Sequence, residues 1–196
     1  MTVPRSIDVA KTELRRRALE RRESIPPDQR LAAAQAIAEL APAVLLRSEI
    51  IVSGYSPLNS EISPLPLMRR CAQAGAHLAL PVVVGRGQPL IMRAWDFGQD
   101  LGSGVWGIRE PKPDAPEAYP DVVLVPLLAF DRRGHRIGYG AGYYDMTIER
   151  LRSLKAITAI GVAYAAQEFD EVPTTPRDAR LDLVLTDRGI NDYRKG

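Results

Sequence analysis

The chain has 196 residues, of which 45% are apolar and 26% are charged, and this balance excludes a disordered, collagen-like or coiled-coil protein. Basic residues number 26 and acidic residues 24, so the net charge of +2 argues against a dedicated nucleic-acid binder. The single cysteine, Cys71, excludes an internal disulfide and argues against a zinc cluster. A chain of this length is expected to form one domain, over residues 1–196.

In the first half of the chain, helical and strand patterns alternate. A helix is expected over residues 7–23, where Lys11, Arg15 and Arg22 fall on one side at spacings of four and seven. Glycine and proline punctuation then predicts a helix over 28–46, a strand over 49–55, a helix over 63–75, and strands over 77–84 and 89–95.

The second half contains the most apolar strands. A long loop over 98–120 is expected to lead into a strand over 121–130, a helix over 141–154, and strands over 156–164 and 181–187. Strands that are apolar on both faces and alternate with helices predict an α/β fold, an open three-layer α/β/α sandwich with a largely parallel sheet. Ligands bind such sheets beyond the carboxyl ends of the strands.

Neither a targeting segment nor a membrane span is expected. Residues 1–30 lack the apolar core of a signal peptide, and the longest apolar run, over 122–130, has nine residues interrupted by a proline. We therefore expect a soluble, cytoplasmic protein that does not bind membranes or nucleic acid, and we expect a monomer.

The densest chemistry follows the strand over 121–130, in the string DRRGHRIGYGAGYYD (131–145). Three glycines alternate directly before the start of a helix: Gly138, Gly140 and Gly142. Three arginines precede them and add positive charge: Arg132, Arg133 and Arg136. Glycine allows close approach of the backbone, and helix-start N–H groups favour anions, so this pattern predicts a phosphate cradle. It is neither a Walker A loop nor a dinucleotide fingerprint, and a tight strand-to-helix turn is the alternative.

Tyrosines and one acid flank these glycines. Tyr139, Tyr143 and Tyr144 either cover a flat ring or pack in the core. Asp145 is a natural magnesium ligand beside bound phosphate, or else an acid that complements the helix dipole.

The longer string PLLAFDRRGHRIGYGAGYYD (126–145) resembles the signature of the 5-formyltetrahydrofolate cyclo-ligase family. Four other segments resemble the family in the same order along nearly the whole chain: KTELRRRALERR (11–22), YSPLNSEIS (55–63), WGIREP (106–111) and VPTTPRDARLDLVLTD (172–187).

This resemblance implies a fold like that of sugar-phosphate isomerases and CoA transferases, and a reaction. ATP and Mg²⁺ would support conversion of 5-formyltetrahydrofolate to 5,10-methenyltetrahydrofolate, with ADP and phosphate released. The formyl oxygen would be phosphorylated first, giving an iminophosphate. Such chemistry needs positioning and electrostatics more than a protein nucleophile.

The resemblance also implies residue roles. The residues that would bind ATP are Lys11, Arg15, Arg136, Gly138, Tyr139, Gly140, Ala141, Gly142, Tyr143 and Tyr144, with Arg136 and Tyr143 as the catalytic pair. The folate would contact Ser53, Glu61, Tyr139, Gly140, Gly142 and Tyr143. Glu61 would accept hydrogen bonds from the pterin, and Asp145 and Asp182 would be the metal-linked carboxylates.

Each role has a structural alternative. Lys11 and Arg15 would otherwise belong to a solvated basic helix, Glu61 would cap the helix that follows it, and Asp182 would begin a strand. Tyr55 and Leu58 are expected as pocket neighbours. The other arginines of the first helix, Arg16, Arg17 and Arg21, are expected to be solvated.

Three departures from the family pattern stand out. Pro176-Arg177-Asp178 replaces a common Pro-His-Asp, Arg180 replaces a common proline, and Ala141 occupies a Gly or Lys position. These leave room for a relative without catalysis or with an altered substrate. A nucleic-acid module fits the net charge poorly. A Rossmann-like oxidoreductase also fits poorly, because Glu168 and Asp170 lie 26 and 28 residues beyond Gly142.

Overall fold

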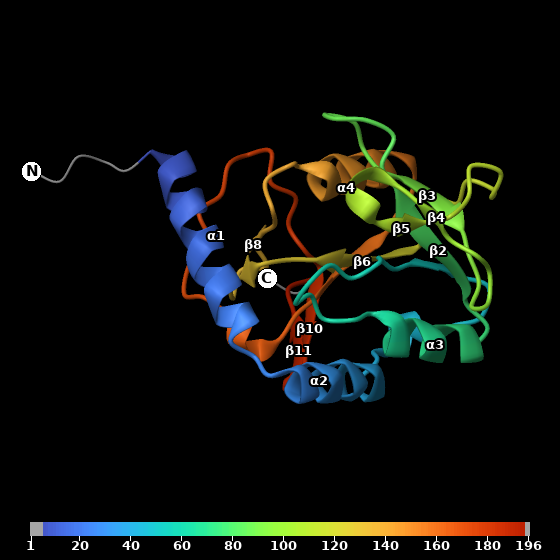
Figure 1. The fold of residues 1–196 in the computed structure, drawn as a ribbon, viewed down its shortest axis with the longest axis horizontal. Helices are drawn as coiled ribbons and strands as arrows, with labels where there is room; N and C mark the ends of the chain where they lie inside the picture. Colours follow the sequence, from blue (N-terminus) through green and yellow to red (C-terminus); the bar gives the residue numbers. More distant parts are fainter. Residues whose placement is uncertain (1–5, 195–196) are drawn as a thin grey trace, which may run out of the picture.

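The computed structural model describes residues 6–194, apart from the side chain of Trp106, and is built around a seven-stranded sheet (Figure 1). The strand order is β11-β10-β9-β6-β1-β2-β3. These strands are β1 (Ile51–Ser53), β2 (His77–Val82), β3 (Ile91–Ala94), β6 (Val122–Pro126), β9 (Thr158–Val162), β10 (Leu183–Thr186) and β11 (Gly189–Asp192).

The central strands of this sheet are parallel. β10, β9, β6, β1 and β2 pair in parallel with their neighbours, whereas β3 and β11 pair antiparallel at the two edges. The expected largely parallel sheet is therefore confirmed. All the carboxyl ends of the central strands meet at one edge, which is where such folds place their ligands.

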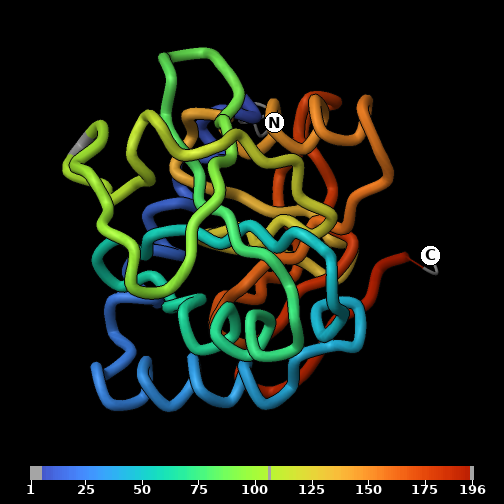
Figure 2. The backbone as a smooth tube through the Cα atoms, turned by 90° about the vertical axis from the view of Figure 1, so that its right-hand side faces the viewer, coloured from blue at the N-terminus to red at the C-terminus, as the bar shows by residue number. Residues whose placement is uncertain are grey.

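Helices cover both faces of the sheet. Helices α2 (Pro27–Glu39) and α3 (Leu65–Gln73) lie together below it, as Figure 2 shows, and α4 (Tyr143–Leu154) lies above it in Figure 1.

Side chains along β6 alternate between these two layers. Val122 and Leu124 pack in the core cluster that includes α2 and α3, whereas Val123 and Val125 pack with Ile148 of α4. This alternation confirms the three-layer α/β/α arrangement.

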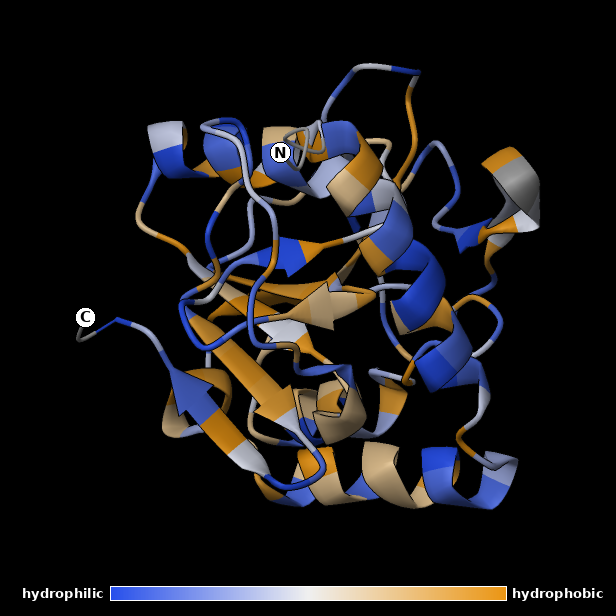
Figure 3. Cartoon of the chain, turned by 90° about the vertical axis from the view of Figure 1, so that its left-hand side faces the viewer, coloured by the Kyte–Doolittle hydropathy of each residue, from blue (hydrophilic) through white to orange (hydrophobic). Residues whose placement is uncertain are grey.

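Helix α1 (Ile7–Glu23) lies outside these layers, at the carboxyl ends of the parallel strands (Figure 1). Leu14 and Ala18 on its buried side pack against Leu128 and Ile137. These partners belong to the segment that contains the short hairpin of β7 (Ala129–Phe130) and β8 (Arg136–Ile137), just beyond β6. The rest of α1 is largely hydrophilic, in contrast to the central strands (Figure 3).

The structure corrects two expected elements. The strand expected over 121–130 ends at Pro126, and the backbone of Leu128 then bonds Ile137, so that β7 pairs with β8 and not with the large sheet. The helix expected over 28–46 ends at Glu39, before Pro42, and a short 3-10 turn, η1 (Ala43–Leu45), follows.

Smaller elements complete the fold. The expected loop over 98–120 contains a two-stranded ribbon of β4 (Gly102–Ser103) and β5 (Arg109–Glu110), joined by the 3-10 turn η2 (Val105–Gly107). A third 3-10 turn, η3 (Ala165–Gln167), follows β9. Across residues 6–194, every helix is too short or too polar to cross a lipid bilayer.

Candidate functional site

A buried acid fixes the hairpin that carries the glycine loop. The carboxylate of Asp131 accepts hydrogen bonds from the backbone N–H groups of Arg133 (2.9 Å), His135 (3.1 Å) and Val172 (3.2 Å). Burial acts to raise the pKa of Asp131, but these donors outweigh it and the net pKa is below its ordinary value. The hairpin therefore forms a rigid support from which the loop departs at Ile137.

The glycine loop spans residues 138–142, between β8 and the start of α4. Gly140 has φ +101° and Gly142 has φ +72°, a left-handed region that residues with a Cβ rarely adopt. Gly142 is the N-cap of α4 and has no side chain to satisfy the first N–H groups of the helix. A helix start without a side-chain cap, beside glycine backbone, is the kind of arrangement that binds phosphate.

One basic side chain of α1 contacts this loop, and a second contacts the segment before β10. Arg15 donates from Nε to the carbonyl oxygen of Gly138 at 3.0 Å, and a Cβ on Gly140 would lie 3.2 Å from its guanidinium. Lys11 lies one turn away, with Nζ 2.6 Å from Oδ2 of Asp178. The alternative of a solvated basic helix does not hold for these two residues, because both are partly buried against the loop segments.

Asp178 lies at the candidate site through its contact with Lys11, and the sequence analysis did not single it out. Burial acts to raise the pKa of Asp178, but the hydrogen bonds from Lys11 and Thr175 outweigh it, and the pKa is lowered. The carboxylate therefore stays ionised and holds the Lys11 ammonium in an ion pair. Its neighbour Arg177, which replaces the family's common histidine, is exposed. The only sequence signal for Asp178 was its place in the Pro176-Arg177-Asp178 segment.

Arg136 and Asp145 form an ion pair below the glycine loop. The two side chains approach to 2.8 Å, and the same carboxylate oxygen, Oδ1, accepts the backbone N–H of Ala179 at 2.9 Å. Arg136 also donates to the carbonyl oxygen of Ala179. Burial lowers the pKa of Arg136 and Asp145 opposes this effect, and a guanidinium remains charged in either case.

The carboxylate of Asp145 suits a magnesium ion whose other ligands include phosphate oxygens. Oδ2 of Asp145 accepts no hydrogen bond from residues 6–194, and the side chain is 27% exposed. Within the described part of the chain, no group of three or more His, Cys, Asp or Glu side chains gathers to hold a metal. Mg²⁺ commonly takes only one or two carboxylates together with substrate phosphates, so Asp145 fits such an ion.

The structure does not bring Asp182 to Asp145. Oδ2 of Asp182, just before β10, accepts from Nη2 of Arg152 at 2.9 Å and from the backbone N–H of Ala159 at 2.7 Å. These are the contacts of an acid at a strand start, which was the structural alternative. Its role toward a metal stays a prediction.

Glu61 and Tyr139 face each other on the other side of the glycine loop. Glu61 accepts the backbone N–H of Leu58 at 2.8 Å and a hydrogen bond from the Tyr139 side chain. Glu61 therefore closes the turn before it and does not cap the helix after it. Burial raises the pKa of Glu61, while the Leu58 N–H, the charge of Arg22 and the Tyr139 side chain all act to lower it.

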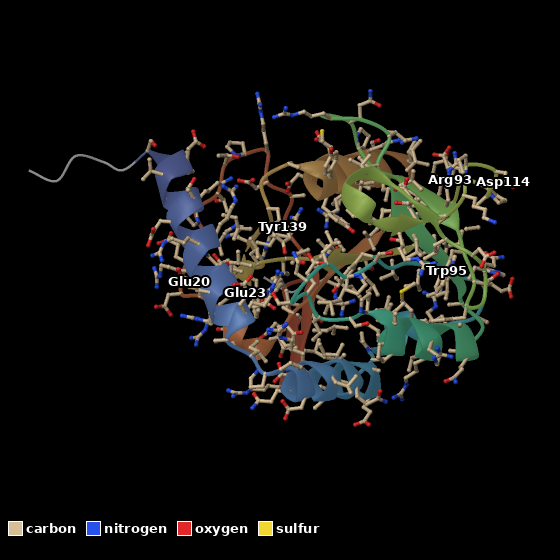
Figure 4. The ribbon with its side chains drawn as sticks, viewed as in Figure 1. Glu20, Glu23, Arg93, Trp95, Asp114 and Tyr139 are labelled. Atoms are coloured by element: carbon tan, nitrogen blue, oxygen red, sulfur yellow. The ribbon has the colours of Figure 1, made fainter. Side chains whose placement is uncertain are left out.

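The three tyrosines of the loop differ in exposure. Tyr139 is 52% exposed and lies beside the turns of α1 that carry Glu20 and Glu23 (Figure 4). Tyr143 and Tyr144 are partly buried and pack on the core cluster beneath α4. Tyr139 is therefore the loop ring that is best placed to cover a flat ligand.

Two further expected folate neighbours lie deeper. The Ser53 side chain at the end of β1 is buried, and its Oγ has no hydrogen-bond partner among the described residues. Tyr55 is buried and donates its hydroxyl to the carbonyl oxygen of Ile62, as a core residue does, and its expected place beside the pocket stays a prediction.

Several arginines expected at the surface or at the loop have other partners. Arg132 pairs with Glu168 and Arg133 with Glu171, so neither adds charge to the glycine loop. Arg16 and Arg21 are both exposed, as expected, and Arg21 also lies over the ring of Phe169 at 4.0 Å and donates to the Ala166 carbonyl.

Comparisons with known proteins give evidence of the family that is independent of this geometry. The sequence model of the 5-formyltetrahydrofolate cyclo-ligase family matches residues 7–187. The chain belongs to this family. That membership confirms the resemblance of the sequence segments and the expectation of an enzyme of the ligase class.

Individual members of the cyclo-ligase family match over most of their length. The 5-formyltetrahydrofolate cyclo-ligase of Mycolicibacterium smegmatis is 33% identical over 189 residues, which is 92% of this chain and 96% of that protein. The enzyme of the same name from Escherichia coli K12 is 28% identical, over 85% of this chain and 94% of that protein.

Solved structures agree with the family assignment. The 5,10-methenyltetrahydrofolate synthetase of Aquifex aeolicus has a TM-score of 0.76 and 28% identity, over 95% of this chain and 94% of that chain. The synthetase of Mycoplasma pneumoniae, at 21% identity and a TM-score of 0.69, shares the fold over 90% of this chain and 98% of that chain.

Proposed function

We propose that the protein converts 5-formyltetrahydrofolate and ATP, with Mg²⁺, into 5,10-methenyltetrahydrofolate, ADP and phosphate. The observation that carries this proposal is the convergence of two half-sites on one glycine loop. Lys11, Arg15 and the start of α4 provide positive charge on one side, and Glu61 with Tyr139 provides an acceptor and an exposed ring on the other.

The first chemical step joins the two ligands. The formyl oxygen of the folate attacks the γ-phosphorus of ATP, the bond from that phosphorus to the ADP oxygen breaks, and ADP leaves with the electron pair. The formyl group becomes an iminophosphate. Lys11, Arg15 and the N–H groups at the start of α4 would hold the phosphates and neutralise the charge that develops on them.

The second step closes the ring. Nitrogen N10 of the folate attacks the activated formyl carbon and loses its proton, and the carbon–oxygen bond breaks to release phosphate. No protein nucleophile is required, so the work of the chain is to align N10 and exclude water. Glu61 would fix the pterin by accepting its N–H groups, and Tyr139 would cover the pterin ring.

Residues below the loop would organise the phosphates. Mg²⁺, when bound through Oδ2 of Asp145, would neutralise phosphate oxygens. Arg136 holds Asp145 in place. We propose that Arg136 and Tyr143 contact the transferring phosphoryl group, and that the remaining loop residues Gly138, Gly140, Ala141, Gly142 and Tyr144 surround the nucleotide.

The proposed enzyme is a single catalytic domain that acts as a cytoplasmic monomer. The one cysteine, Cys71, is buried and free, which suits a reducing compartment. The alternative is a relative that binds ATP without turning folate over. The departure at Arg177 gives it little support, because Asp178 still pairs with Lys11.

A spectroscopic assay tests the proposal. Purified protein, 5-formyltetrahydrofolate, ATP and Mg²⁺ are mixed, and the near-ultraviolet band of methenyltetrahydrofolate is followed. We expect an ATP-dependent rise that Asp145→Asn and Glu61→Gln abolish and that the exposed control Asp114→Asn retains. No rise from the wild type, with ATP binding intact by calorimetry, would support the non-catalytic relative. Loss of ATP binding as well would overturn the phosphate-loop assignment.

A further inference from the structure

Arg22 is a fully buried arginine in the last turns of α1, with 0% exposure. A buried charge is costly unless it is well partnered. Its Nε donates to Oγ of Ser60 at 3.0 Å and its Nη2 donates to the hydroxyl of Tyr139 at 2.5 Å. Its third nitrogen, Nη1, is buried without a hydrogen-bond partner among residues 6–194. The two proposed chemical steps do not use this side chain.

The guanidinium of Arg22 connects three separate segments. It extends from α1, Ser60 belongs to the turn before Glu61, and Tyr139 belongs to the glycine loop. The Tyr139 hydroxyl accepts from Arg22 and hydrogen-bonds Glu61, so it lies between a cation and a carboxylate. The guanidinium carbon also lies 5.6 Å from the centre of the Tyr139 ring. A half-exposed ring is thus held at both its hydroxyl and its face.

We propose that Arg22 is a positioning residue for the folate side of the site: its guanidinium fixes Tyr139 against Glu61, so that ring and carboxylate are in place before folate binds. This inference rests on the proposed function and deepens it. Fixing the two groups beforehand lowers the ordering cost of binding, so it acts on folate affinity and not on phosphoryl transfer.

The charge of Arg22 also bears on Glu61. Arg22 is the cation whose charge acts on this carboxylate, and the other ionisable groups around it are phenols from neighbouring elements: Tyr55, Tyr139, Tyr144 and Tyr164. Burial raises the pKa of Glu61 and Arg22 opposes that rise. Without this positive charge, Glu61 stays protonated up to a higher pH, and a protonated carboxyl group does not accept two pterin hydrogen bonds.

The test measures folate affinity directly. The Kd of 5-formyltetrahydrofolate without ATP is determined by calorimetry for Arg22→Met, Arg22→Lys and Tyr139→Phe, with Arg16→Met as the matched control on the exposed side of α1. We expect Arg22→Met to weaken binding about tenfold, as for loss of a charged hydrogen bond. KM should rise in parallel while kcat changes less than about threefold, and Arg16→Met should match the wild type.

A double variant and the pH dependence of folate binding distinguish a positioning role of Arg22 from a general structural one. The Kd of the double variant Arg22→Met/Tyr139→Phe should be no higher than that of whichever single variant binds folate more weakly, because both changes break the same contact. The acid limb of folate binding should move to higher pH in Arg22→Met and return toward the wild type in Arg22→Lys.

A second variant guards against misfolding. Ser60→Ala removes one tether of Arg22 while keeping its charge, and we expect an increase in Kd of about threefold that also couples to Tyr139→Phe. Additive effects, or a folded Arg22→Met with the wild-type Kd and pH profile, would overturn the inference. A wild type that does not bind folate would instead refute the proposed function.

Discussion

Gly140 is the residue of the glycine loop with least room for a side chain. Its φ of +101° disfavours any Cβ, and that atom would also press on the Arg15 guanidinium at 3.2 Å. Gly98 is a matched control, because it has φ +97° and a Cβ added there would meet nothing within 4 Å. The two glycines thus share the backbone strain and differ only in the contact with Arg15.

Gly140→Ala is expected to weaken ATP binding about tenfold, equivalent to ~1.4 kcal/mol. The added methyl group displaces Arg15 from the loop, whereas Gly98→Ala adds strain without touching the site. Calorimetric titration of both variants with MgATP checks this. Equal ATP affinity in the two variants would show that Arg15 does not depend on Gly140.

Asp145→Asn is expected to raise the Mg²⁺ concentration needed for half-maximal turnover and to lower turnover about 100-fold or more. The amide keeps an oxygen for the Ala179 N–H but loses the charge that a cation needs. Asp182→Asn is the comparison, and its contacts with Arg152 and Ala159 predict lower thermal stability with an unchanged Mg²⁺ requirement. Equal Mg²⁺ effects in both variants would restore Asp182 as a second ligand.

At the residue level, the family resemblance implied that Lys11 and Arg15 contact ATP, and their spacing is compatible because it puts them on one helix face. In the structure Arg15 contacts the glycine loop and Lys11 pairs with Asp178, one helical turn away. Asp178 was not singled out, and Arg22 was placed on the Lys11 face of the helix without a role, because their partners Lys11 and Ser60 lie more than 35 residues away in the sequence. Spacing along one helix cannot reveal such partners.

At the level of elements, the β7–β8 hairpin depends on Asp131. Its carboxylate satisfies three backbone N–H groups, and an asparagine would turn an amide N–H₂ toward at least one of them. Asp131→Asn is expected to lower the free energy of unfolding by about 2 kcal/mol at pH 7. Urea unfolding measures this, and Asp170→Asn, an exposed neighbour, should change stability little.

The same carboxylate gives a pH signature. Because the folded pKa of Asp131 is lowered, its stabilisation is present above the unfolded pKa of about 3.9 and is lost as the pH falls through the folded pKa. The stability difference between the wild type and Asp131→Asn should therefore shrink below about pH 4. A constant difference down to pH 3 would mean that the charge of Asp131 is not what holds the hairpin.

Element boundaries show what local pattern leaves out. The apolar run over 121–130 predicts one strand because periodicity does not report which backbone pairs with which. In the structure Leu128 bonds Ile137, and that pairing turns the chain into the hairpin. The early end of α2 at Glu39 was readable from Pro42, whereas the edge strand β11 has only four residues and a weak pattern.

At the scale of the whole molecule, the class of fold was predictable and the strand order was not. Apolar strands alternating with helices indicate a parallel sheet covered on both faces, and the sheet has this form. The order places β6 between β1 and β9, so that the segments after β1 and β6 bring Glu61 and Tyr139 together. Pairing between strands that are distant in the sequence brings Glu61 and Tyr139 together, and no local sequence pattern predicts that pairing.

We propose that a phosphoryl group passes from ATP to the formyl oxygen of the folate at this meeting point. The most direct test uses 5-formyltetrahydrofolate labelled with ¹⁸O in the formyl group, with mass analysis of the phosphate released during turnover. We expect the label to appear in the phosphate, in step with methenyltetrahydrofolate formation. Unlabelled phosphate would show that water attacks ATP at this site, and it would contradict transfer to the formyl oxygen.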